Sequence, residues 1–250
     1  MKLHRCLPIA ALVLIHPVAA AAQTPAQPPE AVLEKVLTAI GGREALGKLT
    51  SRRLTGTVTV STPAGDISGP IEAMFKPPNK ARTYMTLDLT SLGAGQMTME
   101  QKFDGAKAWA LNSMQGDTEI TGLQLDNMRN NTFPTPLLNY KESGAKLELL
   151  ANQQIGGRNM ILIQVTPKAG SPVKLFIDPD TSLIARTITT IDSPQTGPIE
   201  QTSDLSDYRA VDGIKVAFKI VNTNAAQTVT LNFTKVEHNV PIDDAVFVKK

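Results

Sequence analysis

Apolar and polar residues alternate along most of the chain, in short runs separated by turn signals. The segment IKVAFKI, residues 214–220, places an apolar side chain at every second position, which is the period of a strand with one buried face. Asp212 and Gly213 precede this segment, and an Asp-Gly pair is typical of a tight hairpin turn. We therefore expect two antiparallel strands to meet here, as scaffold at an edge of the sheet rather than as an active site.

Similar runs predict roughly ten or eleven strands, whose order indicates a meander. They are LTGTVTV (54–60), ISGPIEAMF (67–75), RTYMTLDL (82–89), QMTMEQKF (96–103), LELL (147–150), MILIQV (160–165), VKLFID (173–178), LIARTITTI (183–191), IEQTSDLSDYR (199–209), IKVAFKI (214–220) and TVTLNFTKVE (228–237). So many strands with few helices favour a mainly β fold of the α+β kind. We expect a strongly curved antiparallel sheet with the helices covering its concave face.

Helical spacing precedes the strands. Apolar residues between Ala31 and Ile40 recur at helical intervals, and the Gly41-Gly42 pair that follows ends the predicted helix. The segment REALGKL, residues 43–49, predicts a short second helix that leads into the sheet.

The alternation is lost once within the sheet, over residues 121–141. This segment predicts a helix, a break at Pro134 and Pro136, and a second helix. The prolines limit the first helix and supply a hinge, while the apolar residues of the segment still need burial. The segment is therefore either a mobile lid or a fixed plug.

The first residues are typical of a signal peptide. A basic start is followed by an apolar run from Leu7 to Val18 and by three alanines. The run is too short for a bilayer span, and no later segment is apolar for long enough, so we expect no transmembrane segment. We expect three parts: a signal peptide (1–22), a disordered leader (23–30) and a single domain (31–250). The mature protein is then expected to be soluble and periplasmic.

Removal of the signal peptide would leave few reactive side chains. Cys6, His4 and His16 would leave with it, so that His238 becomes the only histidine and no cysteine remains. Disulfides, thiolate catalysis and Cys/His zinc sites are then excluded within this chain. A single histidine without a nucleophile motif argues against an enzyme. The net charge falls from +2 to zero because Lys2 and Arg5 are lost, which argues against a nucleic-acid partner.

No motif indicates a metal or a cofactor. The segment DPDTS, residues 178–182, has closely spaced carboxylates, but the glycine and the distal glutamate of a calcium loop are missing. A Pro-Asp turn explains it better.

Six motifs, in this order, carry a resemblance to a known family. They are VLTAIGGREALGKLTSRRLTGTV (36–58), FDGAKAW (103–109), IGGRNMILIQV (155–165), FIDPDTSLIAR (176–186), SDYRAVDGIKVAFKI (206–220) and HNVPIDDAVF (238–247). In this set the chain resembles the outer-membrane lipoprotein-sorting proteins of the LolA type, over nearly all of its mature length. The resemblance implies a half-open barrel with helices as a lid, enclosing an apolar cavity for acyl chains. The same fold includes LolB-like receptors, mycobacterial carriers of glycolipids and RseB-type sensors that bind a protein.

The candidate ligand-binding residues come from the alternation itself. Methionine is unbranched and adaptable, so a face that pools methionines with leucines suits a variable acyl chain; the same face also suits an ordinary core. Trp109 either stacks on a ligand at the cavity rim or belongs to the core. The predicted set is Met74, Met85, Leu87, Leu89, Met97, Met99, Phe103 and Trp109 from the strands, with Leu123, Met128 and Phe133 from the lid candidate.

These observations favour a periplasmic, non-enzymatic carrier that shelters a hydrophobic ligand, either a lipid or the acyl chains of a lipoprotein. Apolar burial alone gives useful reversible affinity, so no covalent chemistry is needed. The alternative is an interaction or sensor module, RseB-like, in which the cavity or a sheet edge binds an envelope protein.

Overall fold

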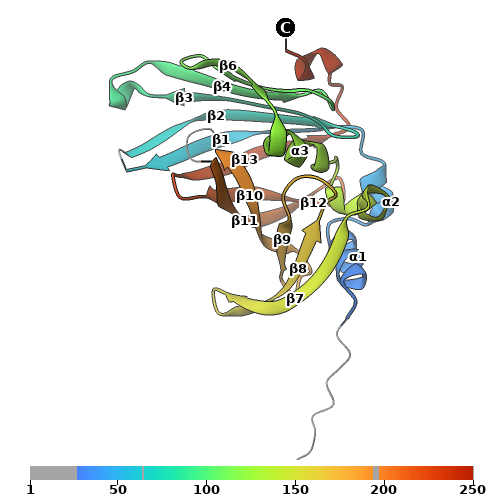
Figure 1. The fold of residues 1–250 in the computed structure, drawn as a ribbon. Helices are drawn as coiled ribbons and strands as arrows, with labels where there is room; N and C mark the ends of the chain where they lie inside the picture. Colours follow the sequence, from blue (N-terminus) through green and yellow to red (C-terminus); the bar gives the residue numbers. More distant parts are fainter. Residues whose placement is uncertain (1–26, 64, 194–196, 250) are drawn as a thin grey trace, which may run out of the picture.

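Thirteen strands form one antiparallel sheet in the computed structural model, which describes residues 27–63, 65–193 and 197–249 (Figure 1). The strands are β1 (Arg52–Thr62), β2 (Gly65–Lys76), β3 (Lys80–Asp88), β4 (Gln96–Phe103), β5 (Ala108–Asn112), β6 (Gly116–Ile120), β7 (Lys146–Ile155), β8 (Arg158–Thr166), β9 (Val173–Ile177), β10 (Ile184–Ser193), β11 (Gly197–Val211), β12 (Ile214–Thr223) and β13 (Thr228–His238). Their order is β6-β5-β4-β3-β2-β1-β13-β12-β11-β10-β9-β8-β7. The mainly β fold and the meander are thus confirmed, and the sheet stays open because its edges, β6 and β7, do not pair.

The predicted count of ten or eleven strands is wrong, because β5 and β6 were not expected. β5 has only five residues, and β6, with the sequence GDTEI, has no alternating apolar positions. An edge strand has one strand partner, and four of the five residues of β6 are exposed. Such a strand leaves no two-residue pattern in the sequence.

The hairpin at Asp212 and Gly213 forms as predicted. Both residues have positive φ angles, 50° and 78°, which suit a tight turn between β11 and β12. Its predicted place at a sheet edge is wrong, however. β1 pairs with β13, so the first and last strands of the chain meet within the sheet and the β11–β12 hairpin lies inside it.

The α-helices gather at one end of the strands instead of covering the whole concave face, so their predicted placement is wrong (Figure 1). The α-helices are α1 (Pro29–Ala39), α2 (Arg43–Gly47), α3 (Gly122–Asn130) and α4 (Tyr140–Ser143), and the 3-10 helices are η1 (Thr90–Leu92), η2 (Pro136–Asn139) and η3 (Asp244–Phe247). The reason is length. The 11 residues of α1 span about 16 Å, whereas the 12 residues of β2 extend for about 40 Å.

The predicted signal peptide over residues 1–22 and the first half of the predicted leader, residues 23–26, lie outside the described residues. α1 begins at Pro29, so its first two residues fall within the stretch expected to be a leader. Each helix in the described part of the chain is too short or too polar to cross a membrane.

The main core lies between α1 and one face of the sheet, here called the inner face. Leu33, Val36 and Leu37 of α1 are almost fully buried, and they belong to one cluster with strand residues such as Val58 and Ile163. Because these two strand residues come from opposite halves of the sheet, α1 holds the halves together at this end.

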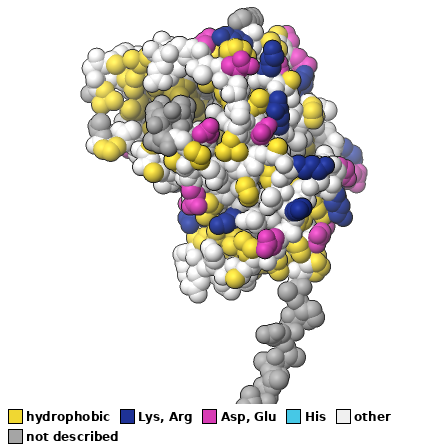
Figure 2. Space-filling view, viewed as in Figure 1, with side chains coloured by type: hydrophobic (Ala, Val, Ile, Leu, Met, Phe, Trp, Pro, Cys, Tyr) yellow, Lys and Arg dark blue, Asp and Glu magenta, His cyan; other side chains and the backbone are white. Residues whose placement is uncertain are grey.

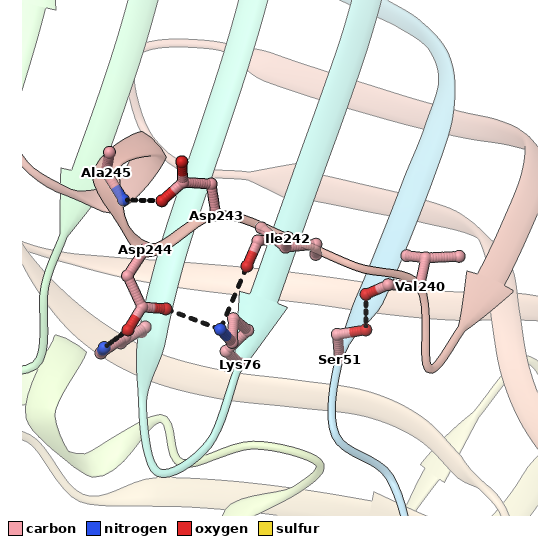
Figure 3. A network of polar contacts seen from close by, with 8 residues as sticks. Ser51, Lys76, Val240, Ile242, Asp243, Asp244 and Ala245 are labelled. Atoms are coloured by element: carbon pink, nitrogen blue, oxygen red, sulfur yellow. Dashed lines mark hydrogen bonds and ion pairs between the residues drawn. The ribbon is translucent and has the colours of Figure 1, made fainter.

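The last residues of the chain fold back over the outer face of the sheet (Figure 3). The carboxylate of Asp244 lies between the ammonium groups of Lys76 and Lys80, at 2.6 Å from each. The Ser51 hydroxyl donates a hydrogen bond of 2.6 Å to the carbonyl of Val240. These polar contacts fix a C-terminal tail, residues 239–249, on the side opposite α1.

Candidate functional site

The inner face carries most of the methionines that the sequence predicts together. Met85 of β3 pairs directly with Met99 of β4, and Leu87 pairs with Met97. Both strands thus place their odd-numbered side chains on one face, as the alternation predicts. Leu87 is buried in the main core, whereas the three methionines are only half-buried. The half-buried methionines therefore leave apolar surface that a ligand can cover.

A cavity of about 630 Å³, here called the large cavity, lies on this face. Met85, Met99 and Ile120 contribute apolar surface, and Gln124 lines it from α3. Asp192 lines it from β10, in the opposite half of the sheet. The large cavity thus spans the space between the two halves. In the space-filling view, hydrophobic side chains surround a hollow at the upper left (Figure 2).

A second cavity of about 350 Å³, here called the small cavity, lies under α1. Val36 of α1, Ile40 just after α1, and Leu137 of η2 line one side, while strand residues such as Leu54 and Phe233 line the other. Thr83 lines both cavities. The two cavities therefore adjoin, and together they offer a long space along the inner face. Its surface is largely apolar, with the carboxylates of Glu100, Glu119 and Asp192 among the residues that line the large cavity.

Arg52 brings a positive charge into the small cavity. Its Nε–H donates a hydrogen bond of 3.0 Å to Nε2 of His238, and its guanidinium carbon lies 5.4 Å from the centre of the Phe133 ring. Burial lowers the pKa of Arg52 to about 10, so the group remains charged at neutral pH. Burial, and next the positive charge of Arg52, lower the pKa of His238. His238 is therefore neutral at pH 7, with its proton on Nδ1, 3.6 Å from a carboxylate oxygen of Asp212.

The segment from α3 to α4 crosses the open side of the sheet. It connects β6 to β7, which are the two edges of the sheet, so the chain has to pass from one edge to the other. On the β6 side, Leu125 and Met128 of α3 pack against buried Phe103 and Ile120.

On the opposite side, α3 is held by polar contacts. Asn127 Oδ1 accepts a hydrogen bond of 2.7 Å from the backbone N–H of Ser171, and its Nδ2 donates to the carbonyl of Thr190. Asn130 donates a 2.6 Å bond to the carbonyl of Ala169. These contacts of Asn127 and Asn130, here called the asparagine clasp, join α3 to the β8–β9 loop and to β10.

The structure places the remaining predicted residues in different surroundings. Leu89 and Phe133 are buried in the main core. Phe103 is buried beside α3, where Met128 packs against it. Leu123 is half-buried at the start of α3. The three lid residues thus lie on or after the helix that crosses the open side, but they do not meet in one cluster.

Two predicted placements are wrong. Met74 faces outward, where it is buried with Ile242 and Phe247 of the C-terminal tail, because β2 directs its odd-numbered side chains inward. Trp109 also lies on the outer face. Its register partners are Lys102 and Glu119, and the ammonium of Lys249 lies 4.2 Å from the centre of its ring.

The DPDTS segment is a turn, as predicted. Oδ1 of Asp178 accepts hydrogen bonds from the backbone N–H groups of Asp180 and Thr181, and Arg158 pairs with Asp178 at 2.7 Å. Over 27–249, apart from positions 64 and 194–196, no three or more His, Cys, Asp or Glu residues gather as metal ligands would.

Three residues that shape the site were not predicted, namely Arg52, Thr83 and Asn127. Arg52 had a detectable signal, because it shares the even-numbered positions of β1 with Leu54 and Val58, which face inward. A basic residue at an inward position indicates a buried charge. Thr83 had the same kind of signal, because it shares the odd-numbered positions of β3 with Met85 and Leu87, which face inward. Asn127 depends on contacts between distant segments, for which the sequence gives no local signal.

Solved structures of very different sequence share this architecture. An outer membrane lipoprotein-sorting protein domain from Vibrio parahaemolyticus is 10% identical, with a TM-score of 0.56, over 86% of this chain and 97% of its own. A LolA superfamily protein from Nitrosomonas europaea is 12% identical, with a TM-score of 0.55 over 88% and 97%. The chain has a LolA-like fold.

A DUF1329 family protein from Desulfovibrio piger is similar to the same extent. It is 11% identical, with a TM-score of 0.57, over 88% of this chain and 97% of its own. No family model matches the sequence, and no curated protein matches it either. The similarity to the LolA-like proteins is thus a similarity of fold, which confirms the family resemblance at the level of architecture.

Proposed function

We propose that this protein is a periplasmic, non-enzymatic carrier that holds the acyl chain of a lipid or lipoprotein against the inner face of its sheet. The observation that carries the proposal is the pair of adjoining cavities, about 630 and 350 Å³ in volume, with half-buried Met85 and Met99 in the larger one. Typical small-molecule pockets measure about 300–1,000 Å³. The combined space therefore suits an extended apolar ligand.

Reversible binding follows from the chemistry of this face. Burying apolar area stabilises a complex by about 25 cal/mol per Å², so a saturated chain is held without covalent bonds. Methionine side chains change rotamers at low cost and adapt to chains of different length. The periplasmic location is supported by the predicted signal peptide, and the acyl cargo is supported by the LolA-like fold.

The experiment compares uptake of a fluorescent fatty acid by purified wild-type protein and by two variants with the same chemical change. Met99→Asp puts a charge into the large cavity, and burying that charge against an acyl chain is costly. Met114→Asp is the matched control, since Met114 is 57% exposed in the β5–β6 turn and lines neither cavity. We expect Met99→Asp to lower affinity at least about tenfold and Met114→Asp to leave it unchanged.

Circular dichroism and the melting temperature establish that both variants fold. If folded Met99→Asp takes up as much fatty acid as wild-type protein, the large cavity is not part of the binding site. If the wild-type protein takes up no fatty acid, and instead co-purifies from its envelope with a protein and no lipid, the interaction module becomes the better account.

A further inference from the structure

The charge of Arg52 is not neutralised by a carboxylate. Within the described residues, the hydrogen bond of its Nε–H to His238 is its only one, so Nη1 and Nη2 have no acceptor. The nearby acid, Asp212, lies on the far side of the His238 ring, 3.6 Å from Nδ1. The guanidinium thus faces the small cavity with both terminal nitrogens available.

The charged residues that line the small cavity are all positive. Arg52 and Lys215 are its charged residues, and no aspartate or glutamate lines it. The hydroxyl of Tyr208, another polar lining residue, is engaged as a donor to the carbonyl of Ile184 at 2.8 Å. The rest of the lining is mostly apolar. Arg52 is half-buried, and a charge partly withdrawn from water is stabilised by a partner of opposite sign. An anion bound here would therefore replace the water that the guanidinium has lost.

From this arrangement we infer that the small cavity binds the head group of a single-chain anionic amphiphile, a fatty acid, with its carboxylate on Arg52. The inference rests on the proposed carrier function and names its ligand class. A carboxylate matches the planar fork of a guanidinium, whose two parallel N–H groups bind its two oxygens. A small head group also suits a space of about 350 Å³ that Leu137 borders.

The path of the chain follows from the position of the head group. Thr83 is where the small cavity meets the large one, and Met85 lies two residues further along the same strand. A fatty acid anchored at Arg52 therefore extends its chain past Thr83 to the methionines. The head group selects the ligand, and the methionine face accepts variable chain length.

The test compares dodecanoate with dodecanol by isothermal titration calorimetry, because the two differ in head-group charge but share one chain length. We expect wild-type protein to prefer dodecanoate at least about tenfold. Arg52→Met should abolish this preference by weakening dodecanoate binding, with dodecanol binding unchanged. Arg53→Met is the matched control, since Arg53 is the next residue, faces outward and pairs with Glu72 at 3.6 Å. It should keep the wild-type preference.

Equal affinity of wild-type protein for both ligands overturns the anion site but leaves the carrier function standing. Failure to bind either ligand refutes the carrier function itself. A preference that survives in Arg52→Met assigns the anion to another residue and overturns the inference.

If Arg52→Met does not fold, the test uses wild-type protein with dodecanoate that carries a ¹³C label at its carboxyl group. ¹³C NMR then measures the pH at which the bound carboxylate titrates. A bound carboxylate beside a guanidinium titrates at lower pH than the free acid. Titration at or above the pH of the free acid overturns the inference.

Discussion

Oδ1 of Asn127, in the helix that crosses the open side of the sheet, accepts a 2.7 Å hydrogen bond from the backbone N–H of Ser171 in the opposite half. Ser171 is buried, and its hydroxyl donates to the carbonyl of Thr190, which also accepts from Asn127. This polar contact is the counterpart of the apolar packing on the other side of α3. Hydrogen bonds to solvent can replace it, so it is the side on which α3 can open.

Hydrogen exchange tests whether the segment is a lid. We expect residues 121–136 to exchange faster than residues 160–165 or 214–220, since a gate belongs to the less stable part of a structure. A fatty acid should slow this exchange. Asn127→Ala leaves the buried N–H of Ser171 without its acceptor, which costs about 1–3 kcal/mol, so exchange in α3 should rise about tenfold or more.

The matched control for this variant is Asn131→Ala, because Asn131 is exposed just after α3. It should exchange like the wild-type protein. A segment that exchanges as slowly as the sheet, with or without lipid, is a fixed plug, and the interaction module would then explain the fold better.

Gly170 allows the β8–β9 loop to approach the asparagine clasp. Its φ angle is +92°, and a Cβ atom there would lie 2.6 Å from Nδ2 of Asn130 and 2.9 Å from Oδ1 of Asn127. We therefore expect Gly170→Ala to speed fatty acid association, measured by stopped-flow fluorescence, by displacing the clasp. Gly157→Ala is the control. Its φ is +80° but no atom lies within 4 Å, so it shares the backbone strain, about 1 kcal/mol or more, without the displacement. Equal association rates in the two variants would show that the asparagine clasp does not control the entry of the fatty acid.

Thr83 tests whether one ligand occupies both cavities. Thr83→Trp fills their junction, so binding of hexadecanoate should weaken about tenfold, while octanoate, which needs only one cavity, should bind as before. Thr57→Trp, exposed on β1, is the control for the added side chain. Unchanged binding of both chain lengths would mean that hexadecanoate does not cross the junction, so that no single ligand occupies both cavities.

The sequence predicted the parts of the site that depend on strand period. The period of two fixes which side chains share a face, so Met85, Met97 and Met99 were placed together correctly. Met74 shares its residue type with the inner methionines but not their face, because it alternates with inward-facing Ala73 in its own strand.

Contacts between segments that lie far apart in the chain could not be predicted from the sequence. The hydrogen bond between Arg52 and His238 joins residues 186 positions apart, and it forms because β1 pairs with β13. The crossing of α3 depends on which strands become the edges, and β6, the strand that it leaves, has no apolar alternation. The orientation of Trp109 could not be predicted either, because it depends on β5, a strand that the sequence pattern does not predict.

The C-terminal tail should detach at low pH. Hydrogen bonds from Lys76 and then Lys80 hold the pKa of Asp244 at about 2, below its ordinary value of 3.8. Because this pKa is lowered in the folded state, the ion pairs stabilise tail docking fully above about pH 4, and their contribution is lost as the pH falls through about 2.

Trp109, the one tryptophan of the chain, reports on this docking because Lys249 of the tail lies over its ring. Its fluorescence should change between about pH 4 and 2, while circular dichroism follows the sheet. Asp244→Asn should show the detached signal already at pH 7, and salt should move wild-type protein toward it, since exposed ion pairs are screened. Asp66→Asn, an exposed control on β2, should behave like wild type. If Asp244→Asn keeps wild-type emission at pH 7, the apolar contacts of Ile242 and Phe247 with Met74 hold the tail without the ion pairs.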